Sequence, residues 1–444
     1  MSVTFREVMS GQPLRVFSVL TFIVCAIVLV ADGMDAQLLG IVAPIIIDEY
    51  GIDRGTFGFA MSAALVGFGL GSWSGGWLGD KVGRRWSLAL AATVFSIGTI
   101  AASTSGDVWQ MAFWRLISGL GFGSAYANAI ALTGEWLPDR WRSVGVTTIS
   151  VGTPAGGMVV SAMAPTLVEN YGWRGSFVFL GILTFLVVGL IIAVLRDSPT
   201  FLLARGKLEE AKKAALKITN EAVDLVAESH DTDTASGSIG VLDRTNLRLN
   251  IGVGVAFTSA TMVAYGILNW TTTILTARGF DFEQASYAVA IAGITSILAS
   301  IAAGLIIQHF GSKLTMTCFS GSLFTTLILL TISMESMSEV PTDGERMLVV
   351  ALIGIAAALF SASIASMYAI MTHAYPPSCR SAGIGFGIFM GRFGAIGSSG
   401  LGGWLLDIGS GSTVPFFAVL GVGALLISCA AFVVDRPIPA LRKT

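Results

Sequence analysis

The feature that most constrains the fold is a series of about twelve apolar runs, each close to the roughly 20 residues that a helix needs to cross a lipid bilayer. The runs lie near residues 16–41, 56–78, 86–104, 109–134, 143–167, 174–195, 249–277, 284–307, 314–333, 347–372, 382–405 and 414–434. Only 12% of the residues are charged, against about 25% in soluble proteins. The sequence therefore predicts an all-α membrane protein with twelve transmembrane helices.

One long polar segment, Arg196 to Arg248, separates the sixth run from the seventh. We expect an amino-terminal six-helix bundle over 1–196, a central segment over 197–247 and a carboxyl-terminal six-helix bundle over 248–444. Within the central segment, 202–216 has the pattern of an amphipathic helix. Residues 221–240 are polar, acidic and rich in Ser and Thr, which is typical of a mobile linker.

The basic residues predict the orientation. If the amino terminus is inside, most of the 26 Lys and Arg residues fall on the inner side of the membrane. The positive-inside rule then places both termini in the cytoplasm, and we expect a plasma membrane of the bacterial inner-membrane type. The net charge of −2 argues against nucleic acid as a partner, because a phosphate-binding surface needs a basic excess.

Metal, disulfide and enzyme chemistry are not indicated. The four cysteines, Cys25, Cys318, Cys379 and Cys429, are widely separated, so neither a metal-binding spacing nor a disulfide framework is supported. No nucleophile with a base and no nucleotide-binding loop is found. We therefore expect no cofactor and no enzymatic activity.

Two short motifs occur once in each half. Residues 76–85 follow the second run and 304–313 follow the eighth, and both segments share two glycines and a final basic residue. Residues 135–142 and 373–380 each place a titratable residue before a Pro and an Arg; these are Glu135 with Arg142 and His373 with Arg380. Halves that resemble each other are typical of secondary transporters, so the two bundles are predicted to be pseudo-symmetric.

Two carboxylates lie in the middle of the first run. Asp32 and Asp35 are three residues apart, so on a helix they share a face. A carboxylate at this depth costs about 2.5–3.5 kcal/mol on insertion scales and therefore normally faces a bundle interior or a water-filled path. Two such groups in a low-dielectric cavity disfavour joint ionisation, and the pair is a candidate proton carrier.

Two arginines also fall within apolar runs. Arg115 and Arg392 carry permanently charged groups that need an anionic partner in the membrane. That partner is either an aspartate of the first run or the carboxylate of a substrate. The alternative for Arg115 is a permanent ion pair that only fixes two helices, and for Arg392 an internal counter-ion.

Aromatic and amide residues on neighbouring helices could supply ring stacking and hydrogen bonds to a bound molecule. Packing against lipid or other helices is the alternative for each of them. The candidates are Tyr126, Asn128, Tyr265, Asn269, Trp270 and Tyr368.

The segment 76–85 closely resembles the loop signature G-x-L-a-D-r-x-G-r-[RK] of the major facilitator superfamily, and 115–123 resembles its R-x-x-x-G-x-G-x-G motif. The resemblance implies two six-helix bundles and a loop that latches the outward-facing state. A basic loop that merely obeys the positive-inside rule would not explain Asp80 or the glycine spacing. The expected gating residues are Gly76, Asp80, Gly83, Arg84, Arg85, Arg142, His373 and Arg380.

Within this superfamily, Asp32-Gly33-Met34-Asp35, together with 391–394 and the loop at Glu135, resembles the aromatic acid:proton symporter family, whose members take up benzoate-type acids. The resemblance implies a monomeric symporter that imports a small aromatic carboxylate by alternating access. Asp32, Asp35 and Glu135 are then the proton-coupling residues. Alternatives are import of a nicotinate-like or aliphatic acid, drug export, and a sensor that binds a ligand without transporting it.

Overall fold

The computed structural model describes residues 5–10, 12–149, 151–219, 240–338, 340–376 and 379–440. Over these ranges the chain is helical, with short connections. The helices are α1 (Phe5–Ser10), α2 (Val16–Tyr50), α3 (Arg54–Val82), α4 (Arg84–Ala102), α5 (Val108–Trp136), α6 (Asp139–Ile149), α7 (Gly152–Val194), α8 (Pro199–Ala204), α9 (Leu208–Ala215), the 3-10 turn η1 (Arg244–Asn246), α10 (Leu247–Ala277), α11 (Phe282–Phe310), α12 (Ser312–Glu335), α13 (Asp343–Ala374), α14 (Arg380–Ile408) and α15 (Val414–Val433).

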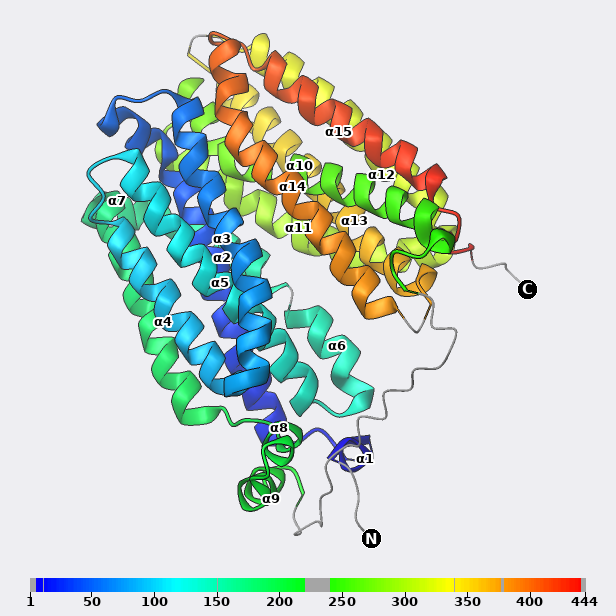
Figure 1. The fold of residues 1–444 in the computed structure, drawn as a ribbon. Helices are drawn as coiled ribbons and strands as arrows, with labels where there is room; N and C mark the ends of the chain where they lie inside the picture. Colours follow the sequence, from blue (N-terminus) through cyan, green and yellow to red (C-terminus); the bar gives the residue numbers. More distant parts are fainter. Residues whose placement is uncertain are drawn as a thin grey trace.

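These helices form two bundles, α2–α7 and α10–α15, each packed mainly within itself (Figure 1). Ten of the described helices are long and apolar enough to cross a membrane. Helix α7 makes two crossings because Gly172, at φ 66°, breaks it in the middle. Helix α14 adds the last crossing; its two arginines and many glycines make it less apolar. The predicted all-α fold of twelve membrane-crossing helices is confirmed for the described ranges.

Glycines let the helices of the first bundle approach closely. A Cβ atom on Gly67 of α3 would lie 2.2 Å from the carbonyl oxygen of Leu116, and one on Gly119 of α5 would lie 2.1 Å from that of Ala64. Such distances are possible only without a side chain, and small residues are the usual means of tight helix packing in lipid. This packing fixes α5, which carries Arg115, against α3.

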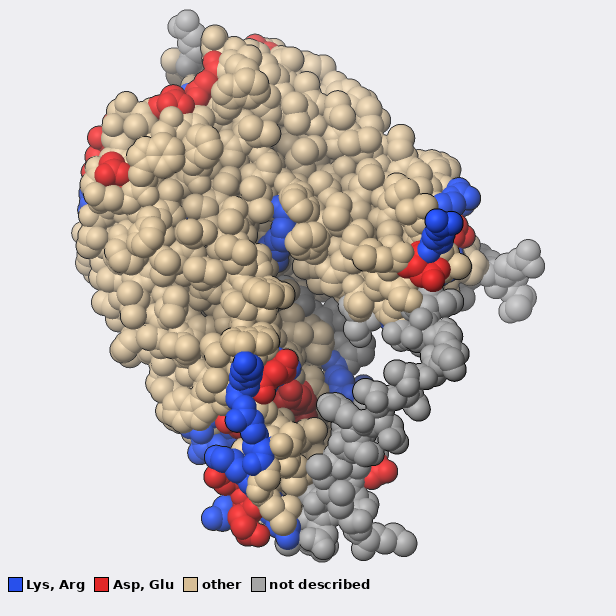
Figure 2. Space-filling model, viewed as in Figure 1, with Lys and Arg blue, Asp and Glu red and all other residues tan. Residues whose placement is uncertain are grey.

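We call the end of the molecule at which α2 begins the basic face, and the end at which α2 finishes the far face. Helices α8 and α9 lie at the basic face, and Figure 2 shows Lys and Arg side chains gathered there. The sequence predicts one amphipathic helix over 202–216, but the chain forms two short helices because Gly206 adopts φ 72°. The predicted linker, 221–240, lies outside the described residues except for Gly240.

The two bundles touch along their far halves. Gln37 Nε2 of α2 donates a hydrogen bond of 2.8 Å to the Leu268 carbonyl of α10, and the Gly55 amide of α3 donates one of 2.8 Å to Asp407 of α14. Toward the basic face the bundles separate, and Figure 2 shows a hollow between them that opens on this side. The site described next lies where the contact gives way to the hollow.

Candidate proton and substrate site

The two aspartates of α2 are buried inside the first bundle. Asp32 is 2% exposed and Asp35 is 4% exposed. Between them, Gly33 touches α7 so closely that a Cβ atom would lie 1.9 Å from the Thr153 carbonyl oxygen. Only glycine permits this approach. The contact brings the start of α7 beside Asp32.

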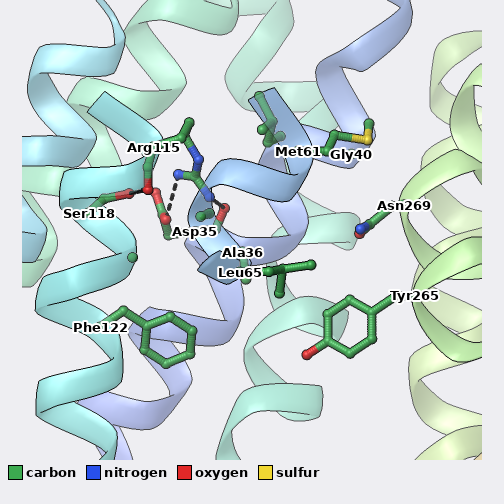
Figure 3. Close-up of a pocket in the computed structure, with 13 residues that line it drawn as sticks. Asp35, Ala36, Gly40, Met61, Leu65, Arg115, Ser118, Phe122, Tyr265 and Asn269 are labelled. Atoms are coloured by element: carbon green, nitrogen blue, oxygen red, sulfur yellow. Dashed lines mark hydrogen bonds and ion pairs between the residues drawn. The ribbon is translucent and has the colours of Figure 1, made fainter. Parts of the chain in front are cut away.

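Asp35 is held by two donors from different helices, and Figure 3 shows one of them, Arg115, with a dashed line to Asp35. Arg115 Nη1 of α5 lies 2.6 Å from Asp35 Oδ2, and Thr99 Oγ1 of α4 donates a hydrogen bond of 2.9 Å to Oδ1. Arg115 is itself only 2% exposed. Both carboxylate oxygens therefore have hydrogen-bond partners, one of them charged.

Asp32 has a much poorer set of partners. Its Oδ2 accepts a hydrogen bond of 3.2 Å from Thr153 Oγ1, and its Oδ1 is buried with no hydrogen-bond partner among the described residues. No ion pair to Asp32 is found over the same ranges. An ionised carboxylate with a bare oxygen in such surroundings is costly. The two carboxylates thus point into the same bundle but have different neighbours.

A small cavity adjoins Asp35 and Arg115 at the junction of the two bundles. Its lining comes from α2, α3 and α5 of the first bundle and from α10 of the second. Figure 3 shows Tyr265 and Asn269 facing it from the side opposite Arg115. The cavity holds about 30 Å³, room for about two water molecules. An aromatic ring can enter here only if the bundles move. Asp32 does not line this cavity.

Arg392 lies on α14 about one turn closer to the basic face than Ile396, whose carbonyl accepts a hydrogen bond from Ser62 of α3. Its guanidinium stacks on the ring of Phe68 of α3, 3.6 Å from the ring centroid. It makes no ion pair with an Asp or Glu among the described residues. Tyr368 lies near both Arg392 and Tyr265, and it packs edge-on against Phe257 with centroids 5.3 Å apart. The structure therefore combines a half-buried cation with aromatic rings from both bundles.

Two of the predicted substrate contacts lie elsewhere. Asn128 is fully buried, and its Nδ2 donates to the Gly75 carbonyl, Ser87 Oγ and the Ser124 carbonyl. Its amide ties α3, α4 and α5 together. Trp270 is fully buried against Gly402 and Gly403 of α14. Neither residue lines this cavity in the described conformation, so the expected substrate contacts of Asn128 and Trp270 stay predictions.

Glu135 does not join the two aspartates of α2, although it was predicted to act with them. It sits at the end of α5 on the basic face, where its Oε1 lies 3.4 Å from Arg84 Nε. Arg84 also pairs with Asp80 at 2.7 Å. Asp80 of α3, Arg84 of α4 and Glu135 of α5 thus form one charged cluster beside the turn between α3 and α4.

The same loop is tied to the chain after α7. Gly83 has φ 106°, and a Cβ atom on it would lie 2.5 Å from an oxygen of Asp197. That carboxylate accepts a hydrogen bond of 3.0 Å from the Arg85 amide. Burial raises the pKa of Asp197, and the Arg85 amide works in the opposite direction. Gly83 is thus required both by the turn and by the close approach of Asp197.

The other predicted gating residues are dispersed. Arg142 donates a hydrogen bond of 2.8 Å to the Gly134 carbonyl and pairs with Asp139 at 2.9 Å. His373 and Arg380 are exposed on the second bundle, and a Cβ atom on Gly76 would meet nothing within 4 Å. Among the described residues, the ion pairs of Asp80, Arg84 and Arg142 and the hydrogen bond of Arg142 are all with residues of the first half.

Two polar neighbours of the aspartates were not predicted from the sequence, namely Thr99 and Thr153. Each is a hydroxyl residue within an apolar run, and in a membrane such a group seeks a hydrogen-bond partner. That signal was available, but many other Ser and Thr residues share it and bond only their own helix, as Thr184 does.

Solved structures with a similar fold are transporters. The crystal structure of a D-xylose-proton symporter matches with a TM-score of 0.72 and 16% identity, covering 96% of this chain and 98% of that one. A partially occluded inward-open structure of the xylose transporter XylE from E. coli matches with a TM-score of 0.71 and 16% identity, covering 95% and 98%. At this identity the likeness concerns the fold alone.

Several curated relatives match over nearly the whole chain. The 4-hydroxybenzoate transporter PcaK of Acinetobacter baylyi is 26% identical over 438 residues, which cover 97% of this chain and 93% of that protein. The gallate transporter of Pseudomonas putida is 26% identical with 96% and 93% covered, and the benzoate transport protein of Acinetobacter baylyi is 26% identical with 98% and 93% covered.

Residues 25–340 match the sequence model of the Major Facilitator Superfamily. The match spans well over half of the chain and reaches from the first bundle through α12 of the second. Together with the fold, it identifies a multi-pass integral membrane transporter rather than an enzyme. This chain belongs to the Major Facilitator Superfamily.

Proposed function

We propose that the protein imports a small aromatic carboxylate together with protons, by alternating access between its two bundles. The relatives that match over nearly the whole chain are named as transporters of 4-hydroxybenzoate, gallate and benzoate. The observation that carries the proposal is the contrast on α2: Asp35 is paired with Arg115, whereas Asp32 is buried with an unpartnered oxygen.

The contrast supports different roles for the two carboxylates. Asp35 stays ionised because Arg115 and Thr99 saturate it. Asp32 carries the transported proton, because a neutral carboxyl needs fewer partners than an anion. A proton on Asp32 also reduces the negative charge near Arg115 and Arg392, and thereby changes how strongly these cations hold a substrate anion.

Arg392 is the proposed anchor for the substrate carboxylate. It makes no ion pair among the described residues, is half-buried, and lies about one turn closer to the basic face than the Ser62–Ile396 contact between the bundles. A guanidinium binds a carboxylate through two parallel hydrogen bonds, and the rings of Tyr265 and Tyr368 nearby can stack on an aromatic substrate. Arg115, whose charge is used by Asp35, then serves proton coupling rather than first contact with the substrate.

The basic face is the proposed cytoplasmic side, since Lys and Arg favour that side of a membrane. With this orientation the hollow opens to the cytoplasm, and the described conformation faces inward. The proposed location is a plasma membrane of the bacterial inner-membrane type.

Uptake into proteoliposomes tests the proposal. With radiolabelled 4-hydroxybenzoate and an outside-acid pH gradient, we expect the wild type to accumulate substrate. Asp32→Asn should abolish accumulation yet retain counterflow exchange, because exchange needs no net proton movement. Glu169→Gln, which removes an exposed carboxylate on the far side, is the matched control and should behave like the wild type. Undiminished gradient-driven accumulation by Asp32→Asn would refute the proposed role of this residue.

A substrate-affinity measurement tests the anchor. Arg392→Gln should raise KM for 4-hydroxybenzoate at least about tenfold, a loss of about 1.4 kcal/mol or more that is typical for a charged hydrogen bond. The variant should unfold close to the wild-type temperature, because Arg392 has no ion pair to lose and gives up only its stacking on Phe68. An unchanged KM would instead favour an internal counter-ion.

A further inference from the structure

Helices α3 and α14 run antiparallel across the junction of the bundles, and their contacts follow a regular register. A Cβ atom on Gly58 would lie 2.3 Å from the Gly400 carbonyl oxygen, and Ser62 Oγ donates a hydrogen bond of 3.1 Å to the Ile396 carbonyl. A step of four residues along α3 thus matches a step of four residues back along α14. Closer to the far face, Gly403 touches Arg54 in the same way.

The same stripe continues on α3 beyond these contacts. At 100° per residue, Gly69, Trp73 and Gly76 lie on the side of α3 that carries Gly58 and Ser62. The opposite side of α3 packs on α5 through Gly67. Yet Cβ atoms on Gly69 and Gly76 would meet nothing within 4 Å, and Trp73 is 81% exposed. This half of the stripe has no partner in the described conformation.

Helix α14 carries a matching stripe without a partner. The side of α14 that contacts α3 near Ile396 continues toward the basic face through Phe389, Gly385 and Ala382. Phe389 is 60% exposed, and a Cβ atom on Gly385 would meet nothing within 4 Å. Figure 1 shows why: α3 and α14 lie side by side toward the far face and diverge toward the basic face.

We propose that these two stripes are one interface, formed when the bundles close at the basic face, in which Phe389 seats on Gly69 and Trp73 seats on Gly385. Continuing the observed register by seven residues from Ser62 and Ile396 brings Gly69 opposite Phe389. Four more residues bring Trp73 opposite Gly385, and three more bring Gly76 opposite Ala382. This inference rests on alternating access as proposed above.

The pairing has good shape complementarity. Trp73 and Phe389 each face a glycine on the other helix, so this part of the closed interface can reach the close packing of a protein interior without moving either backbone far. Two rings opposite each other would hold the helices apart. In the closed state, the ring of Trp73 would be buried against α14 and the ring of Phe389 against α3. The hollow would then be filled where it now opens.

Disulfide formation tests the register. In a background without the four native cysteines, Gly76→Cys with Ala382→Cys replaces only small residues and leaves both rings in place. We expect it to cross-link on mild oxidation, detected by mass spectrometry of the linked peptides, because closure would bring the Cβ atoms within the roughly 4.5 Å that a disulfide needs. The pair Gly76→Cys with Gly385→Cys is one turn out of register and should cross-link more slowly. Faster linkage of this control, or none of either pair, would overturn the proposal.

Exchange of ring and glycine gives a second test. Gly69→Phe should fold normally, since its Cβ meets nothing in the open conformation, but should slow uptake at least about tenfold by disfavouring closure. Adding Phe389→Gly should restore uptake, because one ring again faces one glycine. Gly189→Phe, at an exposed and unobstructed glycine of α7, is the control and should leave uptake unchanged. Normal uptake by Gly69→Phe, or failure of Phe389→Gly to restore it, would contradict the pairing.

The two tests separate this interface from the transport proposal. Cross-linking is measured on the purified protein without substrate or a pH gradient, so it does not depend on which molecule is carried. If the wild type failed to accumulate 4-hydroxybenzoate but the predicted pair cross-linked, the substrate proposal would fail and the interface would stand.

Discussion

Asp32 and Asp35 lie less than one helical turn apart on α2, yet their surroundings differ sharply. Asp35 meets a guanidinium and a hydroxyl, one for each oxygen, whereas Asp32 meets one hydroxyl at 3.2 Å and leaves an oxygen bare. The difference comes from the neighbouring helices, since α4 and α5 reach Asp35 and α7 reaches Asp32. A shared helix face therefore does not give two carboxylates the same chemistry.

The largest predicted effect follows from removing the charge on Asp35. Asp35→Asn leaves Arg115 buried without its counter-ion, and breaking a buried pair in this way typically costs about 3–5 kcal/mol. We expect a large loss in the free energy of unfolding, measured by denaturant titration in detergent. Asp32→Asn should change it by much less, because no cation is left unpaired. Equal losses for the two variants would remove the distinction between the carboxylates.

A double variant sharpens the same point. Asp35→Asn with Arg115→Gln removes both charges together and should recover about half or more of the stability lost by Asp35→Asn alone, because the uncompensated buried charge is gone. The free energy of unfolding of all three variants gives the coupling between the two residues. If the double variant were as unstable as the sum of the single ones, Arg115 would not be the partner that matters to Asp35.

A smaller effect is expected at Thr99. Thr99→Val keeps the shape of the side chain but removes its hydrogen bond to Asp35, which should cost about 1.5–3 kcal/mol for a bond to a charged group. Thr93→Val on the same helix is the matched control, because the hydroxyl of Thr93 bonds only the Ala89 carbonyl. Thermal unfolding of both variants checks the difference, and a loss no greater than that of the control would argue against an ionised Asp35.

The smallest effect is expected at Thr153. Thr153→Val removes a longer hydrogen bond to a carboxyl that we propose to be neutral, so the stability loss should be about 0.5–1 kcal/mol. The pH dependence of uptake should change clearly even though the loss of stability is small, since Thr153 is the one hydrogen-bond partner of Asp32 among the described residues. A loss larger than that of Thr99→Val would reverse the order of the two sites.

The sequence was informative about the fold because the length of each apolar run is a local property that can be read without knowing how the helices pack. The twelve crossings follow from run length alone, and the burial of Asp32 and Asp35 follows from their place within a run. The set of groups next to each carboxylate, by contrast, is determined by helix packing. The contact of Gly33 with α7, which brings Thr153 to Asp32, has no signature in the run itself.

The cavity-facing residues were predicted less well for the same reason. Tyr265 and Asn269 line the cavity, but the adjacent Trp270 packs against α14. The side-chain amide of Asn128 donates its hydrogen bonds within its own bundle. The position of a residue along a helix does not show whether its side chain faces the cavity. That depends on how the helix is rotated about its axis, which is determined by its contacts with neighbouring helices. Glu135 illustrates a further limit, because it forms an ion pair with Arg84, which lies on another helix and is distant in the sequence.

Proton movement coupled to substrate entry tests the central claim most directly. In proteoliposomes containing a pH-sensitive dye, addition of 4-hydroxybenzoate should acidify the lumen for the wild type, beyond the change seen with protein-free liposomes. Asp32→Asn should lose this acidification while still exchanging labelled for unlabelled substrate. If Asp32→Asn acidified the lumen as much per substrate as the wild type, Asp32 would not be the residue that carries the proton.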